Sequence, residues 1–326
     1  MTCEFKIPLM EGEINMVEIN IEMSRRQFIK KTSVLSAATI LAPAYLFGKI
    51  QRPVKHAIPS TGEELAVIGM GTSRTFDIGN DPEIRSQLVK VLQAFFDNGG
   101  ALIDSSPMYG NSEAVLGDLL KNANPSSALF TATKVWIDGR QAGIKQMQDS
   151  ARRMGVKRID LMQIHNLRDW KTHLPTLQDL KQKGLIRYIG ITTSHGRYHD
   201  ELAHIMKTES LDFVQFSYNI DNRAVEKNLL PLAADRGIAT LINRPYARGE
   251  LFKTTRGKSL PDWCREFDCF SWGQFFLKFI VSHPAVTCVI PATSKVHHME
   301  DNMGAGFGRL PDVNQRKRML GYYQSL

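Results

Sequence analysis

The segment "ALIDSSPMYGNSEAVLG", residues 101–117, joins a short apolar run to a polar loop and the start of a second patterned stretch. Residues 101–105 have the length and composition of a buried strand. Residues 112–122 place apolar side chains at helical spacing, which predicts a helix. Because the first run is apolar on both faces, its strand is expected in a parallel sheet that is covered on both sides.

The same strand-then-helix unit recurs along most of the chain. Strands are predicted at 64–71, 101–105, 128–135, 159–165, 186–192, 212–218, 238–243 and 286–291. Helices are predicted at 83–99, 112–122, 140–154, 173–183, 198–207, 224–236, 271–282 and 297–305. Eight such units favour an α/β fold, a single-domain (β/α)8 TIM barrel over residues 45–310.

A doubly wound sheet is the alternative arrangement of these units. Such a sheet normally carries a phosphate-binding turn, G-x-G-x-x-G, after its first strand. The segment "GMGTSR", residues 69–74, has Arg74 where the third glycine should stand. The fingerprint therefore fails, and the closed barrel is favoured.

Composition and charge limit the classes of function. The chain has 43% hydrophobic and 23% charged residues with a net charge of +8, a composition typical of a soluble globular protein. A basic surface favours anionic cofactors or substrates. The lysines and arginines form no long block with interleaved aromatic residues, so nucleic-acid binding is not expected.

The segment "SRRQFIKKTSVLSAATILAPAYLF", residues 24–47, resembles a twin-arginine export signal. Two arginines precede a short apolar run, and small residues at 42–44 suit a signal peptidase. The run is too short for a stable membrane span. We therefore expect a signal peptide at 23–44, the twin-arginine translocation machinery as a partner, and export to the periplasm or an equivalent compartment of a prokaryote.

The segments outside the barrel and the cysteines lead to further expectations. Residues 1–22 are acidic where a signal should begin with basic residues, so they are interpreted as an extra extension that precedes a start at Met23. Residues 311–326 are predicted as a C-terminal tail. Cys264 and Cys269 are five residues apart, which leaves both a disulfide and two buried thiols open. No cysteine or histidine spacing indicates a metal site.

Four titratable residues fall at or just beyond the ends of three neighbouring predicted strands: Asp104, Tyr109, Lys134 and His165. In an eight-fold barrel all of these strand ends open onto one mouth. An ammonium beside a phenol is expected to lower the phenol's pKa, and Lys134 can supply it to Tyr109. Asp104 would keep Lys134 charged. His165 would hydrogen-bond the oxygen that Tyr109 protonates.

On this set the sequence resembles an aldo/keto reductase. The matching stretches are "GMGT", "LIDSSPMYGNSEAVLG", "TATKVW", "RMGVKRIDLMQIHN", "LKQKGLIRYIGI", "FVQFSYN", "PYARGELF" and "VIPATSKVHHMEDNMGA". The resemblance implies carbonyl reduction with NADPH or NADH, with Tyr109 as general acid. It also implies Trp136 in the substrate pocket and cofactor contacts from Asn166, Thr192, Thr193, Gln215, Arg248, Gly249, Leu251, Thr293, Ser294, Lys295, His298 and Asn302.

The sequence departs from the family's usual pattern at three places. Thr192 and Thr193 stand where Ser-Asn is common, and Asn243 stands where many members stack a tyrosine on the nicotinamide. Ala292 and His298 occupy positions often filled by Lys and Arg against the 2'-phosphate. The choice between NADPH and NADH therefore stays open.

The expected function is reduction of an aldehyde or ketone. One alternative is a Schiff-base lyase with Lys134 as nucleophile, and Asp104 argues against it by keeping the amine protonated. Another is a non-catalytic NAD(P)-binding regulatory subunit on the same barrel. The long loop at 247–268 and the tail are expected to determine which carbonyl compound is taken.

Overall fold

We describe residues 52–326 of a computed structural model. The predicted export signal at 23–44 and the acidic segment at 1–22 lie outside the described residues.

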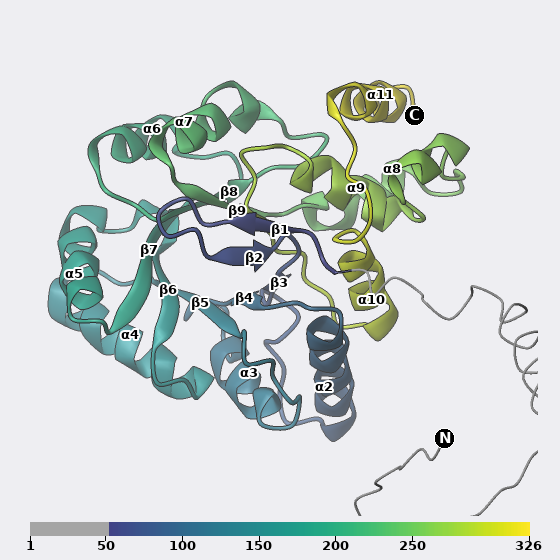
Figure 1. The fold of residues 1–326 in the computed structure, drawn as a ribbon. Coiled ribbons are helices and arrows are strands. Elements are labelled where there is room, and N and C mark those ends of the chain that lie inside the picture. The colour runs from purple at the N-terminus through teal and green to yellow at the C-terminus, as the bar shows by residue number, and fades with distance from the viewer. Residues whose placement is uncertain (1–51) are drawn as a thin grey trace, which may run out of the picture. The chain divides into compact units, whose positions relative to one another are not determined.

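Eight parallel strands form the centre of the described domain (Figure 1). In sheet order they are β3 (Met70–Gly71), β4 (Leu102–Asp104), β5 (Phe130–Val135), β6 (Ile159–Ile164), β7 (Ile186–Thr192), β8 (Phe213–Ser217), β9 (Ala239–Asn243) and β10 (Cys288–Val289). The first and last strands meet, because the Gly69 amide donates to the Val289 carbonyl at 2.8 Å and the Gly71 amide to the Pro291 carbonyl at 2.9 Å. The predicted TIM barrel is confirmed.

The first predicted strand, 64–71, is divided between two sheets. β2 (Glu64–Ala66) pairs antiparallel with β1 (Lys55–Ala57) in a hairpin that lies across one end of the barrel in Figure 1. Only β3 joins the parallel sheet. Gly69 lies between them, where a Cβ atom would be 2.9 Å from the Leu102 carbonyl oxygen, so the chain can pass this close only as glycine.

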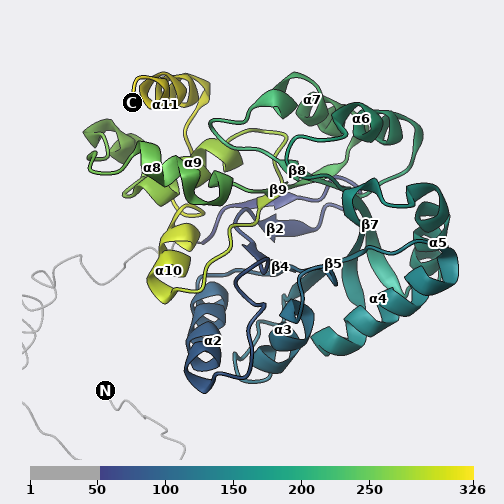
Figure 2. The same cartoon turned by 180° about the vertical axis from the view of Figure 1, so that it is seen from behind.

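Helices surround the barrel, as Figure 2 shows from the opposite side. They are α2 (Pro82–Asp97), α3 (Ser112–Leu120), α4 (Arg140–Met154), α5 (Trp170–Gln182), α6 (His199–Thr208), α7 (Leu229–Arg236), α9 (Trp272–Val281) and α10 (Val296–Gly304). Each predicted helix is present, although the one predicted at 224–236 is a 3-10 turn, η2 (Ala224–Lys227), followed by α7. None of the described helices is long and apolar enough to cross a membrane.

The predicted long loop and the predicted C-terminal tail both contain helices. The loop at 247–268 contains η3 (Ala247–Gly249), α8 (Glu250–Thr254) and η4 (Asp262–Phe267). The C-terminal tail forms α11 (Val313–Gln324), which begins with a capping box of Asp312 and Gln315. The indole of Trp272 on α9 stacks on Tyr322 with ring centroids 6.3 Å apart, so this helix packs against the barrel wall.

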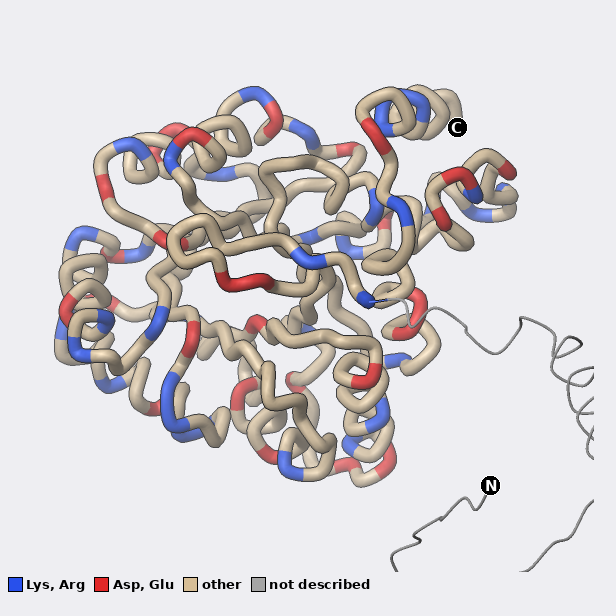
Figure 3. The backbone as a smooth tube through the Cα atoms, in the orientation of Figure 1, with Lys and Arg blue, Asp and Glu red and all other residues tan. Residues whose placement is uncertain are grey.

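Charged residues occupy the outer helices and loops, where basic and acidic positions are interspersed (Figure 3). The barrel interior is apolar, with Leu102, Phe130, Leu161, Phe213 and Leu241 in one cluster. Since inward-facing side chains fill the interior, the barrel has a packed core and no pore. Its chemistry must lie at one end.

Candidate active site

A cavity of about 880 Å³ opens at the C-terminal ends of the strands. Three of the four predicted catalytic residues line it: Asp104, Tyr109 and His165. The fourth, Lys134, lies directly behind Asp104 and is fully buried. Since parallel strands deliver all their carboxyl ends to the same rim, residues 30 to 60 positions apart in the sequence meet here.

Asp104 and Lys134 form a buried ion pair. The Lys134 Nζ donates to Asp104 Oδ2 at 2.6 Å and to the Ser105 carbonyl at 2.7 Å. Asp104 Oδ1 accepts from the amides of Gln163 at 2.9 Å and Gln215 at 3.2 Å. Burial alone would lower the pKa of Lys134, but the charges of Asp104 and Tyr109 raise it above its ordinary value. The lysine is therefore a fixed positive charge.

Tyr109 lies beside that charge. Its ring centroid is 5.2 Å from the Lys134 Nζ. Gly110 follows with φ of 57°, and a Cβ atom there would be 2.3 Å from the Asp77 carboxylate, so only glycine lets the loop turn here. Burial raises the pKa of Tyr109, and the Lys134 charge only partly opposes this. Lys134 acts on the phenol in the expected direction, but burial has the larger effect, so the pKa of Tyr109 lies above its ordinary value and not below it.

His165 is uncharged in this site. Burial, reinforced by the Lys134 charge, lowers the pKa of His165 to about 3. Its Nδ1 is 3.1 Å from the Ser106 Oγ, which already accepts from the Met108 amide. When the Ser106 hydroxyl donates to Nδ1, the imidazole proton lies on Nε2, the tautomer in which His165 can act as a donor. His165 meets Tyr109 edge-on, with ring centroids 5.9 Å apart.

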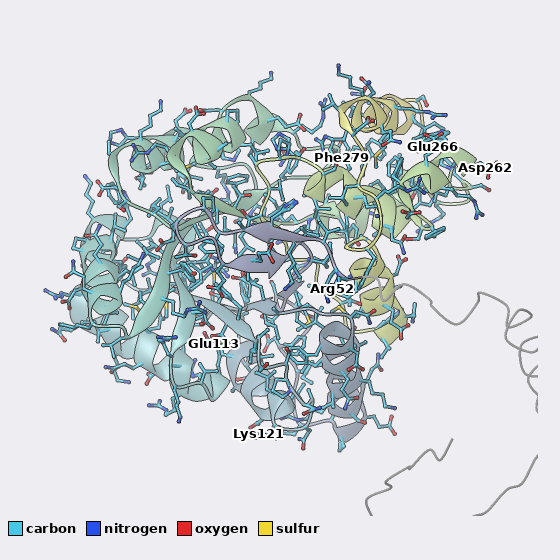
Figure 4. The ribbon with its side chains drawn as sticks, viewed as in Figure 1. Arg52, Glu113, Lys121, Asp262, Glu266 and Phe279 are labelled. Atoms are coloured by element: carbon cyan, nitrogen blue, oxygen red, sulfur yellow. The ribbon has the colours of Figure 1, made fainter. Side chains whose placement is uncertain are left out.

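A second buried carboxylate holds the strand that carries Lys134. Glu113 on α3, labelled in Figure 4, accepts from the hydroxyls of Thr133 at 2.5 Å and Ser150 at 3.1 Å. These bonds join α3, β5 and α4. Burial raises the pKa of Glu113 above its ordinary value. Because Thr133 precedes Lys134, this network fixes the backbone from which the lysine reaches Asp104.

Comparison with known proteins places this arrangement in a family. The sequence profile of the aldo/keto reductase family matches residues 67–315. The chain belongs to the aldo/keto reductase family. Its name specifies reductases of aldehydes and ketones, so the predicted NAD(P)H-dependent oxidoreductase is confirmed at the level of the family.

Individual members differ widely in sequence. Aldo-keto reductase YhdN of Bacillus subtilis is 28% identical over 60% of this chain and 62% of its own length. A protein of Escherichia coli named NADH-specific methylglyoxal reductase is 27% identical over 69% of this chain and 77% of its own. A solved aldo-keto reductase from Klebsiella pneumoniae in complex with NADPH is 20% identical, with a TM-score of 0.67 over 84% of this chain and 95% of that one. The similarity to the Klebsiella pneumoniae structure supports the assignment of the fold.

In this aldo/keto reductase most of the predicted cofactor residues line the same cavity. They are Asn166, Thr192, Thr193, Gln215, Arg248, Gly249, Thr293, His298 and Asn302. The Thr193 hydroxyl is buried and has no hydrogen-bond partner within residues 52–326. A buried polar atom of this kind is costly unless a ligand satisfies it. The wall therefore fits a nicotinamide dinucleotide, with Thr193 and Gln215 available to the amide and Arg248 and Gly249 to the pyrophosphate.

Other predicted residues lie outside the cavity wall. Leu251 is buried in the core, and Ser294 and Lys295 lie just beyond Thr293. Trp136, predicted in the substrate pocket, is 37% exposed, with its ring centroid 6.4 Å from that of His165 and Arg168 stacked on it at 5.0 Å. It does not line the cavity. Cys264, Cys269 and Cys288 are buried free thiols, so the disulfide alternative is not adopted.

Sequence reasoning missed a cluster of arginines. Arg74, Arg197 and Arg244 line the cavity together with Arg248. His195, from the loop after β7, accepts hydrogen bonds from both Arg244 and Arg248. Burial and the charges of Arg248, Arg74 and Arg197 lower the pKa of Arg244 to about 10, with Tyr109 opposing the shift. The sequence signal was the presence of arginines directly after two strands, "GTSR" and "NRPYAR".

Proposed function

We propose that this chain reduces a small aldehyde or ketone with NADPH or NADH, and that Tyr109 donates the proton. One observation carries the proposal. Two uncharged donors, Tyr109 and His165, line one cavity, while the charged pair of Lys134 and Asp104 lies behind them.

Each residue has a distinct task in this mechanism. The nicotinamide, when bound, supplies the hydride. His165 donates through Nε2 to the carbonyl oxygen and orients it. Tyr109 gives its proton to that oxygen, and the Lys134 ammonium stabilises the phenolate left behind. Asp104 keeps Lys134 charged and aimed at the tyrosine.

Relatives support a small substrate and leave both cofactors open. Two relatives in Escherichia coli are named methylglyoxal reductases, one of them NADH-specific. In this chain Ala292 and the exposed His298 offer no fixed positive charge to a 2'-phosphate. Lys295 is the remaining cation near this end of the cavity. We propose that NADH is usable beside NADPH.

The first experiment identifies the cofactor and the reaction together. Mass spectrometry of the purified protein should detect a bound nicotinamide dinucleotide. A panel of aldehydes and ketones should then consume NADPH or NADH and yield the matching alcohols. Failure to oxidise either cofactor with every member of the panel, by a folded protein that binds the cofactor, would favour the regulatory-subunit alternative.

The Schiff-base alternative is disfavoured by the state of Lys134. Its amine is charged, fully buried and occupied by Asp104 and the Ser105 carbonyl, whereas a nucleophile must be neutral and reachable. Borohydride treatment in the presence of substrate should leave Lys134 unmodified. A reduced adduct on Lys134 in the peptide map would support the lyase.

We also propose that the chain is exported by the twin-arginine translocation machinery. The support is the pattern at 24–47 and a barrel whose cofactor is made in the cytoplasm, which suits a route for folded cargo. Replacing Arg25 and Arg26 together with lysine should retain active enzyme inside the cell. Equal activity in the exported fraction of the variant and the parent would contradict the signal.

A further inference from the structure

The arginines at the cavity carry more positive charge than the pyrophosphate of the cofactor can neutralise. Arg74, Arg197, Arg244 and Arg248 all line the cavity, and none forms an ion pair with a carboxylate within residues 52–326. The pyrophosphate of a nicotinamide dinucleotide supplies about two negative charges, one for each phosphate. Roughly two positive charges are left over when the cofactor is bound.

The acidic residues of the cavity do not cancel this excess. Asp104 is already paired with Lys134. Asp301 accepts from the Ser271 hydroxyl at 2.7 Å and the Gln274 amide at 3.0 Å, at the end of the cavity near His298. The excess therefore stays on the side where the loops after β3, β7 and β9 meet.

Arg244 is the arginine of this group that acts on Tyr109. Its positive charge acts to lower the pKa of that phenol, against the larger opposite effect of burial. Arg244 is half-buried, and His195 Nε2 accepts from one of its Nη atoms. The other guanidinium N–H groups donate to no partner within the described part of the chain, and such a planar fork of donors suits a carboxylate in a two-point contact.

The backbone holds these side chains in place at some cost. Arg74, Arg244 and Arg248 have φ of 67°, 55° and 61°, in the left-handed region that non-glycine residues seldom adopt. Strain of this kind gathers at sites that bind ligands. Three strained arginines on one cavity indicate that their positions serve recognition.

We propose that the substrate is a carbonyl compound that also bears a carboxylate, and that Arg244 binds this carboxylate while the carbonyl faces Tyr109 and His165. This inference rests on the proposed reductase function and names its substrate class. Arg74 and Arg248 serve the pyrophosphate, and Arg197 adds long-range attraction for the anion.

Matched substrates test the proposal directly. We would compare kcat/KM for 4-carboxybenzaldehyde with its methyl ester, and for pyruvate with methyl pyruvate. In at least one pair, kcat/KM for the acid should exceed kcat/KM for the ester by about 10- to 150-fold, which corresponds to one charged hydrogen-bond contact. Arg244→Gln should abolish that ratio by lowering kcat/KM for the acid far more than for the ester, while Arg244→Lys should keep part of it.

Binding measurements separate the substrate from the cofactor. Arg244→Gln should weaken benzoate binding to the enzyme–NADP⁺ complex about tenfold or more and leave the NADPH Kd within about threefold. Arg248→Gln should weaken NADPH binding about tenfold or more and leave the benzoate Kd within about threefold. Arg236→Gln removes an exposed arginine far from the cavity and should alter neither value.

Two outcomes would overturn the inference in distinguishable ways. Reduction of the esters without any preference for the acids, or an Arg244→Gln variant that loses cofactor affinity and keeps the acid-to-ester ratio, removes the carboxylate site and leaves the reductase intact. No oxidation of NADPH or NADH with these four compounds or with any member of the aldehyde and ketone panel removes the proposed function, and this inference with it. The acid-to-ester ratio of kcat/KM in the parent protein tests the preference for a carboxylate even where a variant fails to fold.

Discussion

The floor of the barrel, which the β1–β2 hairpin covers, and the mouth, where the cavity opens, hold their arginines in opposite arrangements. On the floor, Arg187 pairs with Glu63 and with Asp160, the latter at 2.9 Å. The Tyr188 hydroxyl donates to the same Glu63 at 2.5 Å. At the mouth, Arg244 and Arg248 have only neutral His195 as a shared partner among the described residues.

This difference separates stability from function within one fold. Paired charges on the floor join the hairpin to β7 and close the barrel. Unpaired arginines at the mouth repel one another, which costs stability in the absence of a ligand and is relieved when an anion binds. Catalysis in eight-fold barrels resides at the C-terminal ends of the strands, and the opposite end serves stability. Substitutions at the two ends should therefore have separable effects.

The largest expected effect is on catalysis at the mouth. Tyr109→Phe keeps the ring and removes the proton donor, so kcat should fall by about 10² to 10⁴, the usual contribution of general acid catalysis. The melting temperature and the NAD(P)H Kd should stay close to those of the parent. A fall of less than about tenfold, with cofactor affinity unchanged, would transfer the acid role to His165.

Lys134→Met tests the buried ion pair with Asp104 behind the cavity. Removing the ammonium leaves Asp104 buried without a counter-ion, which costs about 3–5 kcal/mol of unfolding free energy. Urea denaturation should show this loss, and activity should fall with it. Asp104→Asn with Lys134→Met removes both charges and should recover part of the stability. If the single variant is as stable as the parent, removal of the ammonium does not leave Asp104 as an uncompensated buried charge.

A smaller effect is expected on the floor. Glu63→Gln removes the charge that Arg187 and Tyr188 share, and since this pair is about one-third exposed, screening reduces the loss to about 1 kcal/mol. kcat should not change. Arg248→Gln at the mouth should have the opposite effect. Its free energy of unfolding should be unchanged or higher, and its NAD(P)H Kd should rise. A Glu63→Gln variant that lowers kcat, or an Arg248→Gln variant that unfolds more easily, would break the separation.

Local sequence signals predict the mouth only in part. Asp104, Lys134 and His165 were found because each ends an apolar run, and barrel topology then brings strand ends together. Arg244 could not be placed, because its direction depends on a left-handed backbone at a non-glycine residue. The sign of the Tyr109 pKa shift was missed since burial is a property of the folded surroundings.

The floor illustrates a different limit. Residues 64–71 read as one apolar run, and periodicity contains no signal that divides it into a hairpin strand and a barrel strand. The division of residues 64–71 into two strands depends on Ile58 and Leu65, whose side chains pack in the interior cluster at the end of the barrel. Such a choice is made by tertiary packing, which overrides the preference of the isolated segment.

The smallest effect concerns the cofactor, at the far end of the mouth. Burial, His297 and Lys295 lower the pKa of His298 below its ordinary value, and Asp301 only partly opposes them. His298 is therefore neutral at pH 7.5 and gains charge only below about pH 6.5. That charge would favour the 2'-phosphate of NADPH, although the phosphate itself loses charge near pH 6 and offsets part of the gain.

We accordingly expect the ratio of the NADH Kd to the NADPH Kd to rise by only about two- to fivefold between pH 7.5 and 5.5, the value of one exposed charge contact. Fluorescence titration of both cofactors over this range measures it. His298→Ala should flatten the dependence, and His298→Arg should hold the higher ratio at every pH because guanidinium does not titrate here. A strong preference for NADPH that is independent of pH in the parent would assign the phosphate to Lys295 and leave His298 without a part in cofactor choice.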